Sequence, residues 1–219
     1  MKKIFVSRDL STSSPIRDIA QDHYLVAQSL IDFGARDFEP PKADWIFFYS
    51  RNGVRFFFEK GNFELYPYLW ACLGEGTADE LSHYITDISF IGEGDPEKVA
   101  EDFQSIVASD DVTCYIRAEN SMDSVRKIID RPDDFSIPVY SNSPSRKIPK
   151  EKFDILIFTS PLNADAWFEQ NPYQNEHIIS IGTTTEAHLN DKYGIKDVLV
   201  ATSPTEESMA ECLEIKLSL

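Results

Sequence analysis

The sequence predicts an α/β protein with two similar doubly wound parallel-sheet domains joined by a two-stranded β linker. Short apolar segments alternate with amphipathic stretches that carry helix caps, as strands and crossover helices do in a mostly parallel sheet. Several expected strands are apolar throughout, which is typical of a sheet covered by helices on both faces. The chain also repeats a series of landmarks once, which indicates a duplicated domain.

The repeat consists of two pairs of matching segments. DWIFFYSRNGVRFFFE, which begins at Asp44, aligns without a gap with DILIFTSPLNADAWFE, which begins at Asp154, at an offset of 110 residues (154 − 44). LGEGTADEL, which begins at Leu73, aligns with IGTTTEAHL, which begins at Ile181, at an offset of 108 (181 − 73). A proline further along each copy keeps the second offset. This period is too long for a solenoid repeat and suits a duplicated domain.

Strands are expected where β-branched and aromatic residues cluster. In chain order these segments are KIFVS, YLVAQSLIDF, WIFFYS, SFIG, VTCYIR, IPVYS, ILIFTS, HIISIG and VLVATS. A first helix is expected around residues 16–23. Further helices should begin after Asp95, which Pro96 follows, and after Ser203, which Pro204 follows. At both places a capping side chain, a first-turn proline and acidic residues stand in the preferred order.

The repeat also predicts the domain boundaries. One domain is expected at 36–138, and a second, discontinuous domain at 1–32 plus 144–219, because the second copy needs the N-terminal strand and helix to complete it. The chain would then cross between the domains twice, near 25–41 and 137–148, through extended segments that end in proline-rich stretches. Two neighbouring crossings of this kind can pair as a β ribbon.

The composition excludes several classes of function. The 219 residues include 21 basic and 37 acidic side chains, a net charge of −16 that opposes binding to nucleic acid or to an anionic membrane surface. The start, MKKIFVSRDL, lacks the apolar stretch of a signal peptide. Cys72, Cys114 and Cys212 form no CxxC pair and are expected to be buried free thiols in a reducing compartment. We therefore expect a cytoplasmic protein that binds neither nucleic acid nor membrane.

The duplicated segments mark a candidate binding site. Ligands of open α/β sheets bind beyond the carboxyl ends of the strands, and there Ser50 and Ser160 end one pair of strands, while Thr77 and Thr185 follow a glycine turn at the next pair. First-turn N–H groups and these hydroxyls can hold a carboxylate or a phosphate. The alternative is that all four side chains only cap helices. Four matched corners in two domains favour a shared cleft.

Other kinds of chemistry lack their motifs. The chain contains no GxSxG nucleophile turn and neither of the nucleotide-binding motifs GxxxxGK[ST] and GxGxxG. Its histidines, His23, His83, His177 and His188, have no metal-ligand spacing. We therefore expect neither a cofactor nor a metal ion.

The ordered set of segments resembles the uroporphyrinogen-III synthase family, a family of cofactor-free lyases. The segments that carry the resemblance are DWIFFYSRNGVRFF, LGEGTADEL, VTCYIRAENS, IPVYS, DILIFTSPLNADAWF, IGTTTEAHL and ATSPTEESMAECL. The resemblance implies two α/β lobes on a two-stranded linker. It also implies the reaction: hydroxymethylbilane, a flexible chain of four pyrroles with eight carboxylates, loses water to give an azafulvene cation. Ring D is then inverted through a spiro intermediate, and the macrocycle closes as uroporphyrinogen III.

The resemblance also implies roles for individual residues. Tyr140 in IPVYS matches a tyrosine that assists departure of the hydroxyl group by donating a hydrogen bond or a proton; the alternative is a hinge residue with a satisfied hydroxyl. Tyr49, Thr183 and Glu186 depart from the family pattern. The residues implied to bind substrate are Ser50, Arg51, Asn52, Gly76, Thr77, Arg117, Ser160, Thr184 and Thr185, and Arg8, Arg146 and Lys147 are further sources of positive charge.

Two other functions stay open beside the synthase. One is a noncatalytic two-lobe protein that binds a small anion or a tetrapyrrole, and the other is a decayed synthase kept as a partner protein. The presence of Tyr140 favours the enzyme. The family implies a monomer. A transient contact with hydroxymethylbilane synthase, which makes the unstable substrate, is left open.

Overall fold

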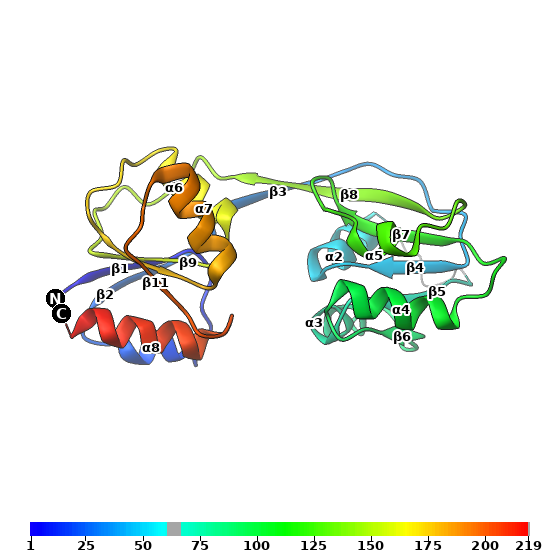
Figure 1. Ribbon diagram of the computed structural model, residues 1–219, viewed down its shortest axis with the longest axis horizontal. Coiled ribbons are helices and arrows are strands. Elements are labelled where there is room, and N and C mark those ends of the chain that lie inside the picture. The colour runs from blue at the N-terminus through cyan, green and yellow to red at the C-terminus, as the bar shows by residue number, and fades with distance from the viewer. Residues whose placement is uncertain (61–66, 219) are drawn as a thin grey trace. The chain divides into compact units, whose positions relative to one another are not determined.

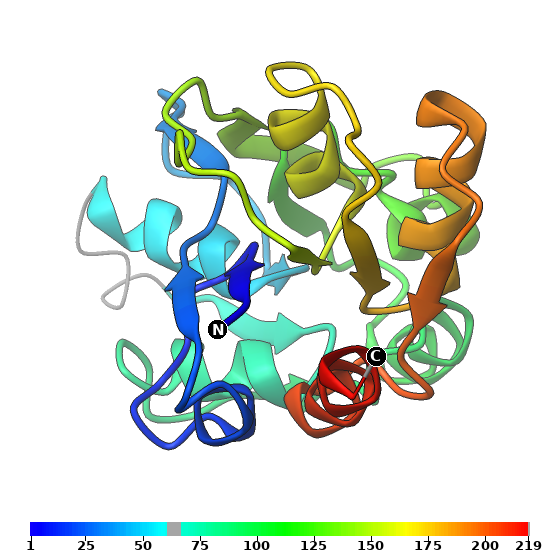
Figure 2. The same ribbon diagram turned by 90° about the vertical axis from the view of Figure 1, so that its left-hand side faces the viewer.

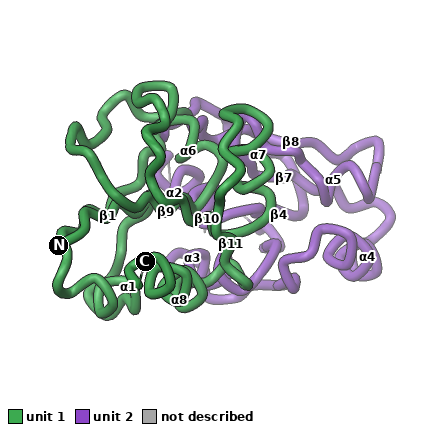
Figure 3. The backbone as a smooth tube through the Cα atoms, turned by 60° about the vertical axis from the view of Figure 1, so that its left-hand side comes forward, with its two compact units in different colours: residues 1–32, 143–219 green, residues 33–142 purple. Residues whose placement is uncertain are grey.

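The structure is a computed structural model that describes residues 1–60 and 67–218. By its internal contacts the chain divides into two compact units, unit 1 (residues 1–32 and 143–219) and unit 2 (residues 33–142), coloured separately in Figure 3. The chain passes from one unit to the other within β3 (Ile31–Ala35) and β8 (Phe135–Pro144), which are neighbours in one sheet. That each unit folds as a separate domain, and that these two strands act as a linker, stay predictions.

Unit 1 is built on a parallel sheet with the strand order β11-β10-β9-β1-β2. Its strands are β1 (Lys3–Val6), β2 (Tyr24–Ala27), β9 (Ile155–Phe158), β10 (His177–Ser180) and β11 (Val198–Val200). Its helices are α1 (Pro15–Ile19), α6 (Pro161–Phe168), α7 (Thr183–Tyr193) and α8 (Glu206–Leu217). The N-terminal strand therefore lies inside this sheet, between β9 and β2.

Unit 2 is built on a six-stranded sheet with the order β3-β8-β7-β4-β5-β6. The strands β8, β7, β4, β5 and β6 pair in parallel. Besides β3 and β8, its strands are β4 (Trp45–Phe48), β5 (Leu69–Cys72), β6 (Phe90–Ile91) and β7 (Thr113–Ala118). Its helices are α2 (Arg51–Glu59), α3 (Glu75–Leu81), α4 (Pro96–Ile106) and α5 (Ser124–Ile129). Figure 1 labels these elements.

Both sheets are covered by helices on both faces. Alternate residues of β4 point to opposite sides: Ile46 and Phe48 pack with α2 and α3, whereas Trp45 and Phe47 pack with α4 and α5. In unit 1, α1 and α8 cover one face and lie side by side, as Figure 2 shows, and α6 and α7 cover the other. This confirms the prediction of two doubly wound parallel-sheet units.

The repeated landmarks have the same structural roles in both units. The Asp44 carboxylate accepts the backbone N–H of Val112 at 2.8 Å, and the Asp154 carboxylate accepts that of Lys3 at 2.7 Å. Each aspartate thus joins the start of its own strand to the start of the neighbouring strand in the sheet. Ser50 and Ser160 cap α2 and α6, and a glycine stands at the N-cap of both α3 and α7. The repeat seen in the sequence is therefore also a repeat of local structure.

One carboxylate joins α6 to α7. The Asp165 Oδ1 atom accepts hydrogen bonds from His188 Nε2 (2.7 Å), Lys192 Nζ (2.9 Å) and the Tyr193 hydroxyl (2.7 Å). Burial alone would raise the pKa of Asp165, but the hydrogen bonds from these three donors hold the pKa below its ordinary value. Burial, followed by the contact with Asp165, raises the pKa of Tyr193 to about 12.

Four expectations about single elements need correction. The helix expected around residues 16–23 is shorter and ends at Ile19. Strand β5 was not expected. The segment YLVAQSLIDF forms two strands instead of one, because β2 pairs in the sheet of unit 1 and β3 in the sheet of unit 2; between them the Leu30 N–H donates to the Asn163 side chain (2.8 Å). The helix expected after Ser203 begins at Glu206, because Thr205 is its N-cap and accepts the N–H of Ser208.

The cysteines and the lengths of the helices can be compared with what the composition predicted. Cys72, Cys114 and Cys212 are free and buried, as predicted. Burial raises the pKa of Cys72 to about 11 and that of Cys114 further. Within residues 1–60 and 67–218, no helix has the length and apolar character needed to cross a membrane.

Candidate functional site

Unit 2 has a pocket of about 950 Å³ at the carboxyl ends of β4, β5 and β6. Three loops line it, and each follows one of these strands, which is where parallel α/β sheets bind their ligands. The lining residues are Tyr49, Ser50, Arg51, Asn52, Leu73, Gly74, Glu75, Gly76, Thr77, Ile91, Gly92, Glu93 and Gly94. The structure therefore brings together five of the predicted residues, Ser50, Arg51, Asn52, Gly76 and Thr77.

Arg51 joins two of the three loops. Its Nε donates to the Gly76 carbonyl oxygen at 2.6 Å, so the first turn of α2 is tied to the first turn of α3. A side chain at Gly76 would meet the guanidinium, because a Cβ there would lie 2.9 Å from an Arg51 terminal nitrogen. Arginine has five donors, and this bond uses one. Among the described lining residues, Arg51 is the one basic side chain, beside the acidic Glu75 and Glu93.

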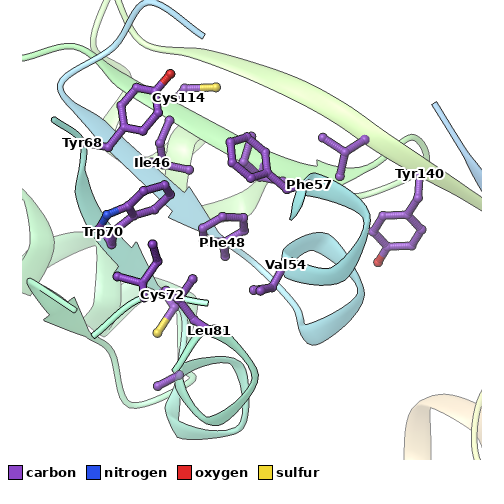
Figure 4. Close-up of a cluster of buried hydrophobic side chains, with 14 of the residues drawn as sticks. Ile46, Phe48, Val54, Phe57, Tyr68, Trp70, Cys72, Leu81, Cys114 and Tyr140 are labelled. Carbon is purple, nitrogen blue, oxygen red and sulfur yellow. The ribbon is translucent and has the colours of Figure 1, made fainter. Parts of the chain in front are cut away.

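Tyr140 lies on β8 beside this pocket, with its hydroxyl oxygen 3.1 Å from Ser50 Oγ. The side chain is 5% exposed, and its ring stacks on Phe56 of α2 at 5.2 Å between centroids. Figure 4 shows Tyr140 beside α2, the helix that also carries Val54 and Phe57. The hydroxyl of the predicted catalytic residue therefore contacts a residue of the pocket lining.

The serines and threonines of the repeat differ in what they do. Ser50 Oγ accepts the N–H of Gly53 at 3.1 Å and Ser160 Oγ accepts that of Asn163 at 3.2 Å, so both serines cap helices. Thr77 and Thr185 are buried third residues of α3 and α7 and cap neither helix. Both serines therefore cap helices, as the alternative expected, whereas neither threonine does.

The remaining predicted residues lie outside the pocket. Arg117 Nη1 donates to the carbonyl oxygens of Ala118 and Glu119, both at 2.8 Å, so this guanidinium holds the loop after β7. Ser160, Thr184 and Thr185 belong to unit 1, where Thr184 is exposed in the first turn of α7. Each of these four residues thus lies at the end of a strand or at the start of a helix.

Two comparisons with known proteins, one with family models and one with solved structures, point to the same family. The family model described as uroporphyrinogen-III synthase HemD matches residues 24–211, most of the chain. The chain belongs to the uroporphyrinogen-III synthase family. This confirms the resemblance found in the sequence, and with it the activity: the family cyclises hydroxymethylbilane in heme biosynthesis.

Solved structures of the synthase family share the fold. A uroporphyrinogen-III synthetase from Helicobacter pylori is 24% identical with a TM-score of 0.70, and the match covers 100% of this chain and 99% of that one. A mutant uroporphyrinogen III synthase from Thermus thermophilus is 13% identical with a TM-score of 0.57, again over 100% and 99%. At these identities the likeness concerns the fold. No curated protein matches the sequence.

Sequence analysis missed part of the pocket of this synthase. The loop Ile91–Gly94 lines it, although the strand SFIG before the loop was expected and the same end-of-strand rule would have included it. Tyr49, which departs from the family pattern, also lines the pocket, and its hydroxyl accepts the N–H of Arg126 at 3.0 Å. Burial raises the pKa of Tyr49 far above its ordinary value, so this phenol stays protonated.

Proposed function

We propose that the pocket of unit 2 binds the reacting end of hydroxymethylbilane and that Tyr140 is the acid that assists the departure of water. The observation that carries this proposal is the 3.1 Å contact between the Tyr140 hydroxyl and Ser50, a residue of the pocket lining. A positioned phenol can donate a hydrogen bond or a proton to a leaving hydroxyl group. The cation that remains is reactive enough to close, so the main task of the enzyme is to hold the two chain ends in position.

We propose that substrate carboxylates bind to Arg51, Asn52, Gly76 and Thr77. Arg51 supplies positive charge and a planar set of donors that matches a carboxylate. Glu75 also lines the pocket and would repel a carboxylate, whereas Glu93 pairs with Lys98. The two signs of charge would therefore steer each carboxylate toward Arg51, although the chain as a whole carries a charge of −16.

The other predicted residues remain part of the proposal with more limited roles. Thr184 and the first turn of α7, an eleven-residue helix, are proposed to bind a carboxylate in unit 1, together with Ser160 and Thr185. Arg117 is proposed to act through its positive charge, because its Nη1 already donates to two backbone carbonyls. No cofactor or metal is part of the proposed chemistry.

We further propose that the protein works as a cytoplasmic monomer and meets hydroxymethylbilane synthase transiently. The negative charge of the chain opposes attachment to anionic membranes. The instability of the substrate favours a direct handover between the two enzymes. Analytical ultracentrifugation of the protein, alone and mixed with hydroxymethylbilane synthase, tests the monomeric state and the contact between the two enzymes.

The test of the activity is an isomer-resolved coupled assay. Hydroxymethylbilane is generated in situ, the protein is added, and the products are oxidised and separated as uroporphyrin isomers. The proposal predicts a dominant type III isomer. Formation of only the spontaneous type I isomer would contradict catalysis by this chain and would favour the noncatalytic binding protein.

A further inference from the structure

The first turn and the middle of α2 hold Tyr140 at two points. Ser50, the N-cap of α2, contacts the phenol oxygen at 3.1 Å, and Phe56 on the same helix stacks on the ring at 5.2 Å with an interplanar angle of 14°. Phe33, which is 43% exposed, packs against the ring at 6.0 Å. Because both the ring and the oxygen contact α2, the orientation of the phenol is fixed relative to that helix.

Counting hydrogens shows what the Ser50 contact does. A serine hydroxyl has one hydrogen to donate and two lone pairs that accept. One lone pair of Ser50 Oγ already accepts the Gly53 N–H at 3.1 Å. If Tyr140 donated to Ser50, its only hydrogen would point away from a substrate. If Ser50 donates to Tyr140 instead, the phenol hydrogen is free to reach the leaving group.

We propose that Ser50 is a positioning residue, which donates its hydroxyl hydrogen to the Tyr140 oxygen and so directs the phenol hydrogen to the substrate. This inference rests on the proposed role of Tyr140. It assigns Ser50 a function in orienting the acid instead of binding a carboxylate directly. The resulting chain of donors runs from the Gly53 N–H through the Ser50 and Tyr140 hydroxyls to the hydroxymethyl group.

The same chain of donors stabilises the charge that forms. When the C–O bond breaks, its electron pair leaves with the oxygen, and the proton from Tyr140 makes the departing group water. Positive charge stays on the azafulvene and negative charge on the phenol oxygen, which Ser50 then stabilises. Hydrogen bonds in a row polarise one another, and the positive end of the nine-residue α2 lies at the start of this row. The proton released after ring closure returns to Tyr140.

The repeat provides an internal comparison. In unit 1 the matching serine, Ser160, accepts hydrogen bonds from both the N–H and the side-chain Nδ2 of Asn163, at 3.2 and 3.0 Å. Asn163 stands where unit 2 has Gly53, at the same offset of 110 (163 − 53). Gly53 offers no competing side chain, and a Cβ there would lie 3.4 Å from Ser50 Oγ. The glycine therefore leaves the second lone pair of Ser50 unfilled, whereas Asn163 fills both lone pairs of Ser160 and leaves only its hydrogen.

A double-mutant cycle tests this inference. The rates of type III formation are measured for wild type, Ser50→Ala, Tyr140→Phe and the double variant. We expect Ser50→Ala to lower kcat about tenfold, which corresponds to about 1.4 kcal/mol, with KM unchanged. In the Tyr140→Phe background, Ser50→Ala should have no further effect on kcat, because both substitutions remove the same hydrogen bond between Ser50 and Tyr140. A raised KM at unchanged kcat, or effects that multiply, would overturn the inference.

Two further variants separate this role from helix capping. Ser50→Thr keeps a hydroxyl at the cap and should recover most of the lost kcat. Gly53→Asn offers the second lone pair of Ser50 the amide that unit 1 uses, so that Ser50 can only donate to Tyr140 and kcat should stay near the wild-type value. A Gly53→Asn variant as slow as Ser50→Ala would count against the inference, and so would a Ser50→Thr variant as slow as Ser50→Ala.

Ser160→Ala is the matched control, because it removes the same cap bond in unit 1. Its effect should multiply with that of Tyr140→Phe, unlike the effect of Ser50→Ala. The proposed function and this inference also fail in different ways. An unchanged kcat in Tyr140→Phe would contradict the role of Tyr140, whereas a slow Tyr140→Phe beside a fast Ser50→Ala would contradict only the inference about Ser50.

Discussion

Replacing Gly92 by alanine should damage both the stability of unit 2 and its pocket. A Cβ at Gly92 would lie 2.6 Å from the Leu73 carbonyl oxygen and 2.5 Å from Val99 Cγ2, well inside ordinary contact. The side chain of Val99 is buried against the sheet. The Leu73 oxygen cannot move freely either, because it accepts the N–H of Gly94 at 2.8 Å. The methyl group can therefore be accommodated only by shifting backbone.

The expected cost follows from this crowding. Overpacking of a core usually costs about 1–3 kcal/mol, and a clash with backbone belongs at the upper end, roughly 2–3 kcal/mol. For a chain of this size, about 2–4 °C of melting temperature is lost per kcal/mol, so the midpoint should fall by roughly 4–12 °C. The loops around Gly92 and Leu73 both line the pocket, so KM should rise as well.

Thermal and urea denaturation, followed by circular dichroism, measure the stability, and the isomer-resolved assay measures KM. Gly34→Ala is the control, because a Cβ there would approach only the Ser141 hydroxyl, at 3.1 Å, and a rotation of that side chain relieves the contact. Removing a glycine in this way should leave stability unchanged or raise it slightly. A Gly92→Ala protein as stable as the Gly34→Ala protein would refute the reasoning.

Three other changes have defined outcomes. Asp165→Asn should lower the free energy of unfolding by about 2 kcal/mol at pH 7. The pKa of Asp165 in the folded protein lies below its ordinary value, so the stability that Asp165 contributes is lost as pH falls through the folded pKa. Urea titrations should therefore show the wild type and the variant converging in stability below about pH 4; a constant difference would contradict this. Arg51→Gln should raise KM about tenfold with a smaller effect on kcat, and the KM of Arg51→Lys should lie between those of wild type and Arg51→Gln. An unchanged KM in the steady-state assay would remove Arg51 from the binding site. Cys72 and Cys114 should react with a thiol reagent at pH 8 only after unfolding, because burial raises both pKa values; rapid labelling of the native protein would show that they are accessible.

The fold could be predicted because its signals are local. Each copy of the repeat carries an aspartate before an apolar strand and a serine after it, and these residues take the same hydrogen bonds in both units. Strand β5 was missed because Leu69–Cys72 is a four-residue run with no β-branched residue. At the break between β2 and β3, where the chain leaves one sheet for the other, Leu30 bonds to Asn163, 133 positions away, and no local pattern contains such a contact.

Five residues of the pocket lining were predicted from the sequence, but their contacts were not. Ser50 and Thr77 follow from the repeat and from the rule that ligands bind at strand ends. The contact between Ser50 and Tyr140 joins residues 90 positions apart and depends on the packing of β8 against α2. Arg117 was expected to face the substrate, yet two backbone carbonyls occupy its Nη1. A sequence pattern locates a charged residue along the chain, whereas the packing of the folded protein decides which groups its side chain contacts.

The two units also show how a duplicated corner can diverge. Both keep the capping serine, but the residue three positions later is glycine in unit 2 and asparagine in unit 1. Ser160 therefore accepts from the Asn163 side chain as well as from its N–H, whereas Ser50 accepts from the Gly53 N–H and contacts Tyr140. The acid chemistry we propose belongs to unit 2.

Binding of the tetrapyrrole in the pocket of unit 2 is tested most directly by NMR. The ¹⁵N-labelled protein is titrated anaerobically with uroporphyrinogen III, the product, and the backbone amide shifts are followed. Saturable shifts in the three loops Tyr49–Asn52, Leu73–Thr77 and Ile91–Gly94, weakened by Arg51→Gln, are the predicted result. Saturable binding that shifts amides elsewhere and leaves these three loops unchanged would contradict the proposed site.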